Sequence, residues 1–546
     1  MARFPLLPAH LLPAPLLPGA VLPAAAALVF FLATRAGAQI LPETGTTVQV
    51  GNLRQQLEGL LATGADVVTA PGWTIVPAVG LEQRWTDHLQ GVGSPEGDSS
   101  FITALRPSVL VNGQTARTTM SLSYAPDLEY YSVSGHQNRI NQNLNASSHA
   151  ILVPEHLFLD LRGFAGLQAI NSGSGSNPTT AEVSQNETQT MSFSVHPYLR
   201  QRFGDLGVAE LGATWSRSTQ DNLSGTQANG SSGQHLTSEQ EYFSLSSGPD
   251  FGRTSAALSV SANQGSGNGG VNNSRRDQAT LSLGYAITRD LTALAGIGYE
   301  DIHYGGIPPF HYAGTDWDAG LRWIPNPDSS VTVTYGRQEG LESARLDASY
   351  APTARTRVYA RYSEGIATGM EQLLNAMNSS GVDQAGNSVS GNGTPVQLSN
   401  GFYGVQNNLS RVTSASLTAT LLLERDAVSA SFSRQQRRQL AAASAATAGA
   451  LESTGYYSTL SWQRSLWPDL NAFAFVQWGT GENSSPGVPN QTYESLVVSL
   501  RLTYSVSETL AAYAQYSWTR QTYFLAAGSA ILLPTNLVVI GARKIF

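Results

Sequence analysis

The residue types that could carry chemistry occur here without the spacing that a catalytic or metal site needs. The stretch GSGNGG (265–270) matches G-x-G-x-x-G, but a dinucleotide site needs a helix directly after it, and VNNSRRD instead leads into another strand pattern. We interpret this stretch as an outer loop. His303 and His311 belong to no H-E-x-x-H motif, and the chain has no cysteine. We therefore expect a non-catalytic protein without cofactor or metal.

A more informative set of charged side chains follows one face of several predicted strands. In these segments every second residue shares a face, and the opposite face is apolar. Acidic and basic groups on neighbouring strands are typical of a wet pore wall, where they either form structural salt bridges or select solutes by charge. The candidate lumen-facing residues are Asp316, Asp318, Arg322, Arg345, Asp347, Arg357, Arg361 and Arg501.

Strands must position these side chains, because a period-two alternation of apolar and polar residues runs from Trp73 to the end of the chain. In YESLVVSLRLTYS (493–505), Leu496, Val498, Leu500, Leu502 and Tyr504 share one face and Arg501 lies on the other. ATLSLGY (279–285) repeats the pattern. Each such segment has one face suited to lipid and one suited to water.

The connectors between these strands alternate in length. Short acidic turns such as FGDLG (203–207) and WPDLN (467–471) alternate with long Gly/Ser/Asn loops such as 169–187 and 366–409. Short turns on one side and long loops on the other are the pattern of outer-membrane barrels. Aromatic residues near both strand ends, such as Tyr285, would form girdles at the two membrane interfaces.

We therefore predict an all-β fold, a closed antiparallel transmembrane up-and-down β-barrel of about 22 strands, with short periplasmic turns and long extracellular loops. Both termini would be periplasmic. The terminal Phe546 resembles the signal read by the barrel assembly machinery. The strands are expected to start near residues 73, 101, 115, 139, 155, 188, 206, 236, 252, 274, 290, 313, 330, 341, 354, 410, 424, 452, 468, 491, 508 and 535.

The composition agrees with a barrel wall. Charged residues are 13% of the chain, about half of the usual fraction in a large soluble protein, while the hydrophobic fraction is 41%. The formal net charge is −8 and the chain has no basic run, so nucleic acid is not an expected partner. The expected partner surfaces are the outer-membrane lipid bilayer and the barrel assembly machinery.

The N-terminus has the features of a secretory signal. Arg3 provides a small positive region, an apolar stretch follows at 24–33, and Ala36-Gly37-Ala38 forms a cleavage site. A membrane anchor is the alternative, but the apolar stretch is shorter than the roughly 20 residues that a spanning helix needs. We predict a signal peptide at 1–38, a periplasmic or lumenal extension at 39–72 and the barrel at 73–546.

Three stretches resemble a family of outer-membrane β-barrel proteins that is associated with exopolysaccharide and PEP-CTERM export systems. These are GWTIVPAVGLEQRWTDH (72–88), NRINQNLNASSHAILVPEHLFLDLRGFAGLQ (138–168) and HPYLRQRFGDLG (196–207). The resemblance covers nearly the whole mature chain and transfers no catalytic residue. It implies a location in the outer membrane beside polysaccharide and its export components.

Three functions follow as hypotheses. The first is a non-catalytic pore or accessory component of an exopolysaccharide export system, which the resemblance implies. The second is a general diffusion porin for small solutes. The third is an outer-membrane enzyme that acts on lipid or glycan, for which the sequence shows no site. A barrel of this width would have an open lumen unless something fills it.

The loop 366–409 is the longest connector and contains apolar residues. GMEQLLNAMNSSG (369–381) has helical spacing at Met370, Leu373, Leu374 and Met377. Apolar residues in an outer loop usually need to be covered. We expect a loop packed on the outer surface, and the alternative is a segment that folds inward and constricts the lumen.

Overall fold

The computed structural model describes residues 72–88, 99–132, 138–169, 187–222, 234–268, 272–390, 396, 398, 405, 407–442, 452–485, 488–524 and 530–546. The predicted signal peptide (1–38) and nearly all of the predicted extension (39–72) lie outside the described residues, so their boundaries stay predictions. None of the described helices is long and apolar enough to cross a membrane.

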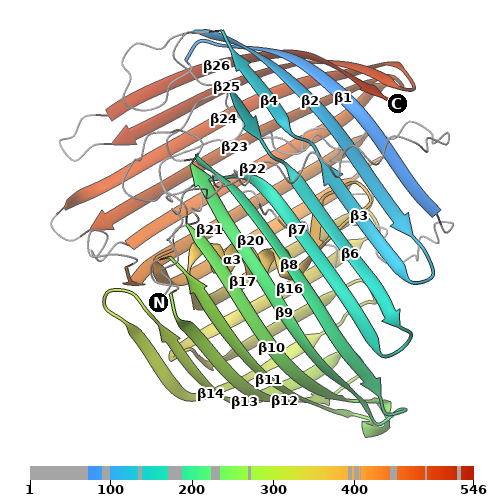
Figure 1. Ribbon diagram of the computed structural model, residues 1–546, viewed down its shortest axis with the longest axis vertical. Coiled ribbons are helices and arrows are strands. Elements are labelled where there is room, and N and C mark those ends of the chain that lie inside the picture. Colours follow the sequence, from blue (N-terminus) through green and yellow to red (C-terminus); the bar gives the residue numbers. More distant parts are fainter. Residues whose placement is uncertain are drawn as a thin grey trace, which may run out of the picture. The chain divides into compact units, whose positions relative to one another are not determined.

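The described chain forms one large antiparallel sheet that closes on itself, because β1 pairs with both β2 and β26 (Figure 1). Closure leaves no unpaired edge, as the sequence predicts. The strands are β1 (Gly72–Thr86), β2 (Ser100–Gln114), β3 (Thr118–Tyr124), β4 (Asp127–Tyr131), β5 (Arg139–Asn141), β6 (Leu144–Val153), β7 (Leu157–Ala169), β8 (Glu187–Arg202), β9 (Gly207–Asn222), β10 (His235–Ser247), β11 (Thr254–Gly267), β12 (Ser274–Ala286), β13 (Leu291–Tyr304), β14 (Phe310–Trp323), β15 (Ser330–Gln338), β16 (Leu341–Thr353), β17 (Thr356–Ala367), β20 (Leu409–Leu422), β21 (Asp426–Ala441), β22 (Glu452–Trp467), β23 (Leu470–Ser485), β24 (Val488–Ser507), β25 (Leu510–Phe524) and β26 (Ala530–Ile545).

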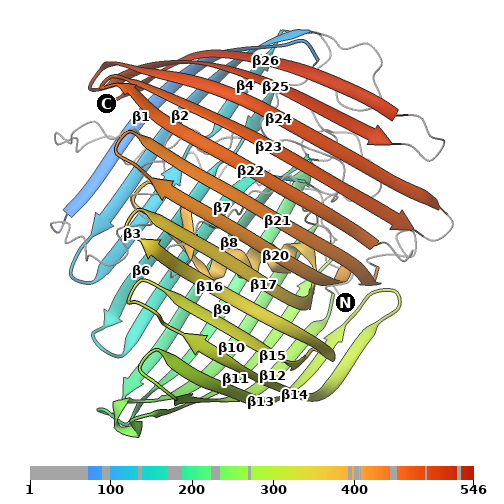
Figure 2. The ribbon, with the colours of Figure 1, turned by 180° about the vertical axis from the view of Figure 1, so that it is seen from behind.

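These 24 strands make 22 spans of the described barrel, which confirms the predicted number. The difference arises because β3 with β4, and β5 with β6, each form one interrupted span: β2 pairs with both β3 and β4, β3 pairs with β6, and β4 pairs with β5. Consecutive spans pair with each other around the barrel, so the chain runs up and down as predicted. Figure 2 shows the wall formed by β20–β26 from behind.

Local sequence explains where the strands turn. The chain reverses after β8 with Gly204 at φ 58°, a left-handed conformation that glycine adopts without steric cost, and the Phe203 N–H donates to the Gly207 carbonyl at 2.9 Å. A one-turn 3-10 helix, η1 (Pro249–Phe251), performs the same reversal after β10. Most short connectors lie at the end of the barrel where β1 begins and β26 ends, and the turn between β15 and β16 lies at the opposite end.

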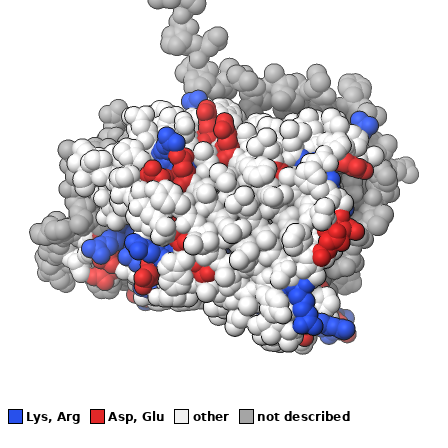
Figure 3. Space-filling view, turned by 90° about the horizontal axis from the view of Figure 1, so that it is seen from below, with Lys and Arg blue, Asp and Glu red and all other residues white. Residues whose placement is uncertain are grey.

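The outer face of the wall is apolar. Leu211, Ile297, Leu321 and Ile540 are large side chains that are exposed on this face. In the face that Figure 3 shows, a broad area carries no acidic or basic side chain, and charged side chains gather mainly towards its margins. A closed sheet satisfies its backbone hydrogen bonds internally, which a lipid environment requires. The fold is therefore that of a protein of the bacterial outer membrane.

A buried charge network holds the region where the barrel closes. The guanidinium of Arg84 on β1 donates to Glu82 at 2.8 Å, to Glu129 at 2.6 Å and to Asp127 at 2.9 Å. Tyr513 of β25 donates to Glu82 at 2.6 Å across the closing pair. Buried charges with this many partners fix the register of the strands that carry them.

Candidate functional site: a segment inside the barrel

The connector between β17 and β20 contains the helix that the sequence predicts. Helix α3 (Gly369–Asn378) begins after Thr368, whose hydroxyl accepts from the N–H of Glu371, while the Glu371 carboxylate accepts from the N–H of Thr368. This reciprocal capping box satisfies two of the free donors at a helix start. The predicted helical spacing of apolar residues in 369–381 is thus confirmed.

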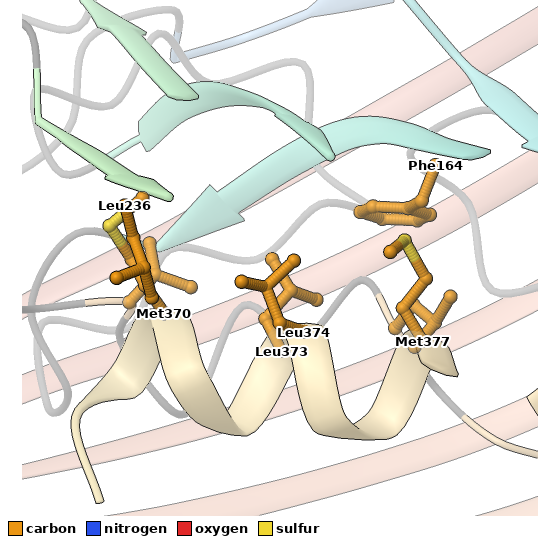
Figure 4. Packing of buried hydrophobic residues seen from close by; sticks show 8 residues of the cluster. Phe164, Leu236, Met370, Leu373, Leu374 and Met377 are labelled. Carbon is orange, nitrogen blue, oxygen red and sulfur yellow. The ribbon is translucent and has the colours of Figure 1, made fainter. Parts of the chain in front are cut away.

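The apolar face of α3 packs against the inner wall. Met370, Leu373, Leu374 and Met377 form a buried cluster with Phe164 of β7 and Leu236 of β10, and the side chains of α3 point towards those strands in Figure 4. Met370 and Met377 are fully buried. Packing of these four large side chains against the wall removes their apolar surface from water, which stabilises α3 at this position.

A small hairpin follows α3 and is anchored by one arginine of the wall. It consists of β18 (Ser380–Val382) and β19 (Ser388–Ser390). Arg162 of β7, which is 7% exposed, donates to the Ser380 carbonyl at 3.0 Å and to the Ser388 hydroxyl at 3.0 Å. Hydrogen bonds from a buried guanidinium are among the strongest that a loop can receive.

The tip of this hairpin fits closely against β2, β3 and β6. Asn112 donates to the Gln384 carbonyl at 2.7 Å, and Asn145 donates to the Gly386 carbonyl at 2.7 Å. Gly386 has φ 88°, and a Cβ at this position would lie 2.6 Å from the Cβ of Ser123. Only glycine fits here without strain or displacement of the wall.

Residues further along the connector are also bound by the wall. Gln168 of β7 donates to the Leu398 carbonyl at 2.6 Å, and Gln220 of β9 donates to the Val405 carbonyl at 2.9 Å. We use the name lumenal segment for the described residues of this connector, 368–390, 396, 398, 405, 407 and 408. Most hydrogen bonds from the wall are accepted by backbone carbonyls of the lumenal segment. They therefore depend on the path of its backbone more than on its side chains.

The lumenal segment also reaches strands on the other side of the barrel. Arg437 of β21 donates to the Gln372 side chain at 3.1 Å, and Tyr304 of β13 donates to the Glu371 carboxylate at 3.0 Å. The segment therefore lies within the lumen, and α3 lies between the walls in both Figure 1 and Figure 2. The expectation of a surface-packed loop is wrong, and the inward-folded alternative is correct.

An ion pair and its hydrogen bonds to the backbone fix the position where the lumenal segment begins. Arg276 of β12 donates to the carbonyl of Ile366, the penultimate residue of β17, at 3.0 Å, and it pairs with Glu339 at 3.0 Å. Glu339, in the turn between β15 and β16, also accepts from the N–H of Ile366. Burial raises the pKa of the Glu339 carboxyl above its ordinary value, although Arg276 and the Ile366 N–H act in the opposite direction.

The eight predicted lumen-facing residues lie on the strand faces opposite to exposed apolar side chains such as Trp317 and Leu321. Two of them, Asp347 and Arg361, face each other in the register of β16 and β17. The eight do not gather into one compact cluster, and a role in solute selection stays a prediction. Asp316, Arg357 and Arg501 are buried, Asp318 and Arg345 are half-buried, and Arg322, Asp347 and Arg361 are exposed.

The residues that bind the lumenal segment were not predicted from the sequence. Arg162, Gln168 and Gln220 are polar residues on the inner face of their strands, like many others. The sequence gives no distinct signal for Arg162, because Asp160 lies on the same face of LFLDLRGF (157–164) as an opposite charge. Its partners in the lumenal segment lie more than 200 residues away.

The other sequence features have ordinary positions. In GSGNGG, residues 265–267 belong to β11, 269–270 lie outside the described residues, and β12 begins at Ser274, so no helix follows directly. His303 and His311 lie on β13 and β14, and His311 is 3.1 Å from Asp301. Phe546 is exposed and its N–H donates to the Pro77 carbonyl at 3.0 Å. Its role as an assembly signal stays a prediction.

Comparisons with known proteins give a likeness of fold. No family model matches the chain, and no curated protein matches it. The ferric-catecholate import receptor Fiu of E. coli K12 aligns with 88% of this chain and 82% of its own, at 10% identity and a TM-score of 0.47. A mutant ferric enterobactin receptor of Pseudomonas aeruginosa, in complex with enterobactin, aligns with 88% and 82% at 13% identity and 0.45. The iron transporter FrpB of Neisseria meningitidis aligns with 89% and 83% at 10% identity and 0.36.

These findings correct the predicted function. The pore or accessory component of exopolysaccharide export, and the general diffusion porin, both assumed an unobstructed lumen, whereas the lumenal segment lies inside it. The structures cited above are receptors or transporters for iron complexes. Nothing found supports the resemblance to the exopolysaccharide-associated family beyond the barrel itself.

Proposed function

We propose that this protein is a gated transporter of the outer membrane, in which the lumenal segment closes the passage and moves to let a selected solute through. One observation carries this proposal: a single connector is bound to β2, β6, β7 and β9 on one side and reaches β21 on the other. A passive channel needs no such anchored obstruction.

The mode of attachment suits a movable element better than a fixed core. Its interactions with the wall are hydrogen bonds from individual side chains and one apolar seat under α3. Each hydrogen bond contributes about 0.5–1.5 kcal/mol net, or about twice that when the donor is charged. A solute that offers replacement contacts can therefore shift the segment, because it needs only a difference in affinity between the two states.

The test is single-channel conductance of the full chain in a planar bilayer, beside a variant in which 369–390 is replaced by a short Gly-Ser linker. The intact protein should give small or rare openings, and the variant should give large, stable, ohmic steps. Folding of both is checked by the heat-dependent shift in gel mobility that closed barrels show. Equal conductance of two folded proteins would overturn the proposal.

The solute is tested separately, because the fold alone does not assign one. Uptake into liposomes that contain the protein is measured for neutral sugars, amino acids, phosphate esters and a ferric catecholate, the class that the receptor Fiu imports. A gated transporter should favour one class over the others. Uptake of all classes in order of size alone would identify a simple channel and count against gating.

A further inference from the structure

A small polar cavity of about 50 Å³ lies between α3 and the wall formed by β9–β13. Its wall side is a row of neighbours in strand register: Thr214 faces Gln240, Gln240 faces Asn263, and Asn263 faces Arg276. Four adjacent strands thus present one side chain each at the same height. The cavity has room for about four water-sized groups, at about 10–15 Å³ for each.

The polar stripe of α3 forms the other side of this cavity. Glu371, Asn375 and Asn378 lie at helical spacing on the stripe beside the buried methionines and leucines. Leu374 and Ile366 add an apolar edge. One half of the cavity therefore belongs to the element that closes the lumen, and the other half belongs to the fixed wall.

The charged groups at this cavity are already paired within the protein. Arg276 is bound to Glu339 and to the Ile366 carbonyl, and Glu371 is bound to Tyr304 and to the Thr368 N–H. By contrast, Thr214, Gln240 and Asn375 make no hydrogen bond with any other described residue through their side chains. The groups that remain for a ligand are neutral amides and a hydroxyl, each able to donate and to accept.

We propose that this cavity binds a neutral polyhydroxylated solute, with one edge of a sugar-sized ring held between α3 and the wall. Amides that both donate and accept match adjacent hydroxyl groups of such a ring. An anion would find its only cation already engaged by Glu339. The inference rests on the proposed function, because the solute would bind where the moving segment meets the wall.

The probe for the test is glucose, and binding to the refolded full chain in detergent is followed by saturation-transfer NMR. Q240A and N375A each remove a binding amide and should weaken binding by about tenfold or more. Q435A is the matched control, because Gln435 is also a glutamine of the inner wall near α3 but contacts Gln372 outside the cavity. Gel mobility confirms that each variant is folded.

Saturable binding of glucose to the native chain and to Q435A, with loss in Q240A and N375A, is the expected result. Absence of saturable binding to the folded native chain would overturn the inference, and so would unchanged binding in both cavity variants. Tighter binding of glucose 6-phosphate than of glucose by more than tenfold would overturn the neutral class. If the linker variant conducts and no sugar binds, the gated transporter stands and this inference fails.

Discussion

Asn378, in the last turn of α3, donates a hydrogen bond of 3.1 Å to the hydroxyl of Ser216 on β9, which lies 162 residues earlier in the chain. The contact joins the lumenal segment to the wall that surrounds it. Asn378 and Ser216 are both small enough to be replaced by cysteine, and one lies on the lumenal segment while the other lies on the wall.

A disulfide at this contact should hold the lumenal segment in place. The chain contains no cysteine, so S216C/N378C introduces a single possible pair. Oxidised protein should show fewer openings in a planar bilayer than native protein, and a reductant should restore them. The two single-cysteine variants are the controls. A fully cross-linked barrel that conducts like the native one would show that α3 does not move during opening.

Two glycines of the hairpin offer a matched comparison. Gly386→Ala puts a Cβ against Ser123 in a left-handed backbone conformation, whereas Gly381 has nothing within 4 Å of its Cβ position. Strain of this kind costs about 1–3 kcal/mol, so G386A should loosen the hairpin and raise conductance, and G381A should leave it unchanged. Hydrogen exchange of the hairpin amides measures the loosening directly. Similar exchange in both variants would mean that the tip does not hold the segment.

We expect Arg162 of β7 to hold the hairpin of the lumenal segment in place. Arg162→Ala removes hydrogen bonds to Ser380 and Ser388, and bonds of this charged type contribute about 1.5–3 kcal/mol. We expect 380–390 to become sensitive to added protease while the barrel keeps its gel mobility. Arg217→Ala, which changes an exposed arginine, is the control. Protease sensitivity equal to that of the control would refute an anchoring role.

Removal of Arg84 should destabilise the barrel itself. The carboxylates of Glu82, Asp127 and Glu129 would lose a shared buried partner, and breaking buried pairs costs about 3–5 kcal/mol. R84A should lose its compact gel mobility at a lower temperature than the native protein. R275A, at an exposed ion pair, should not. An unchanged transition in R84A would mean that neighbouring arginines compensate for the loss.

Acid should favour the closed state. Burial raises the pKa of Glu339, and burial also raises the pKa of Asp383 in the hairpin turn, despite hydrogen bonds from Asn387. A carboxyl with a raised folded-state pKa contributes stability that is complete below its ordinary pKa and is lost as pH rises through the raised value. Openings should therefore become rarer as the pH falls from neutral towards the ordinary pKa of a carboxyl group. E339Q and D383N should each reduce this dependence, and an unchanged pH profile in the double variant would assign it to other groups.

The sequence predicted the barrel well because strand signals are local. Alternation within a segment and a turn such as FGDLG (203–207) depend on neighbouring residues, so the spans and their number could be inferred one at a time. Helix α3 was predicted for the same reason. Its place was not, because it depends on partners such as Arg162 and Gln220, which meet the segment only after the barrel has closed.

The lumenal segment lies inside the barrel, and it also braces the wall. Its bonds to β7 and β9 on one side and to β21 on the other tie together parts of the wall that share no hydrogen bond with each other in the sheet. Movement of the segment, as proposed for opening, would therefore remove a cross-connection between distant parts of the wall. On that proposal, variants that conduct freely should also be the ones that unfold most readily.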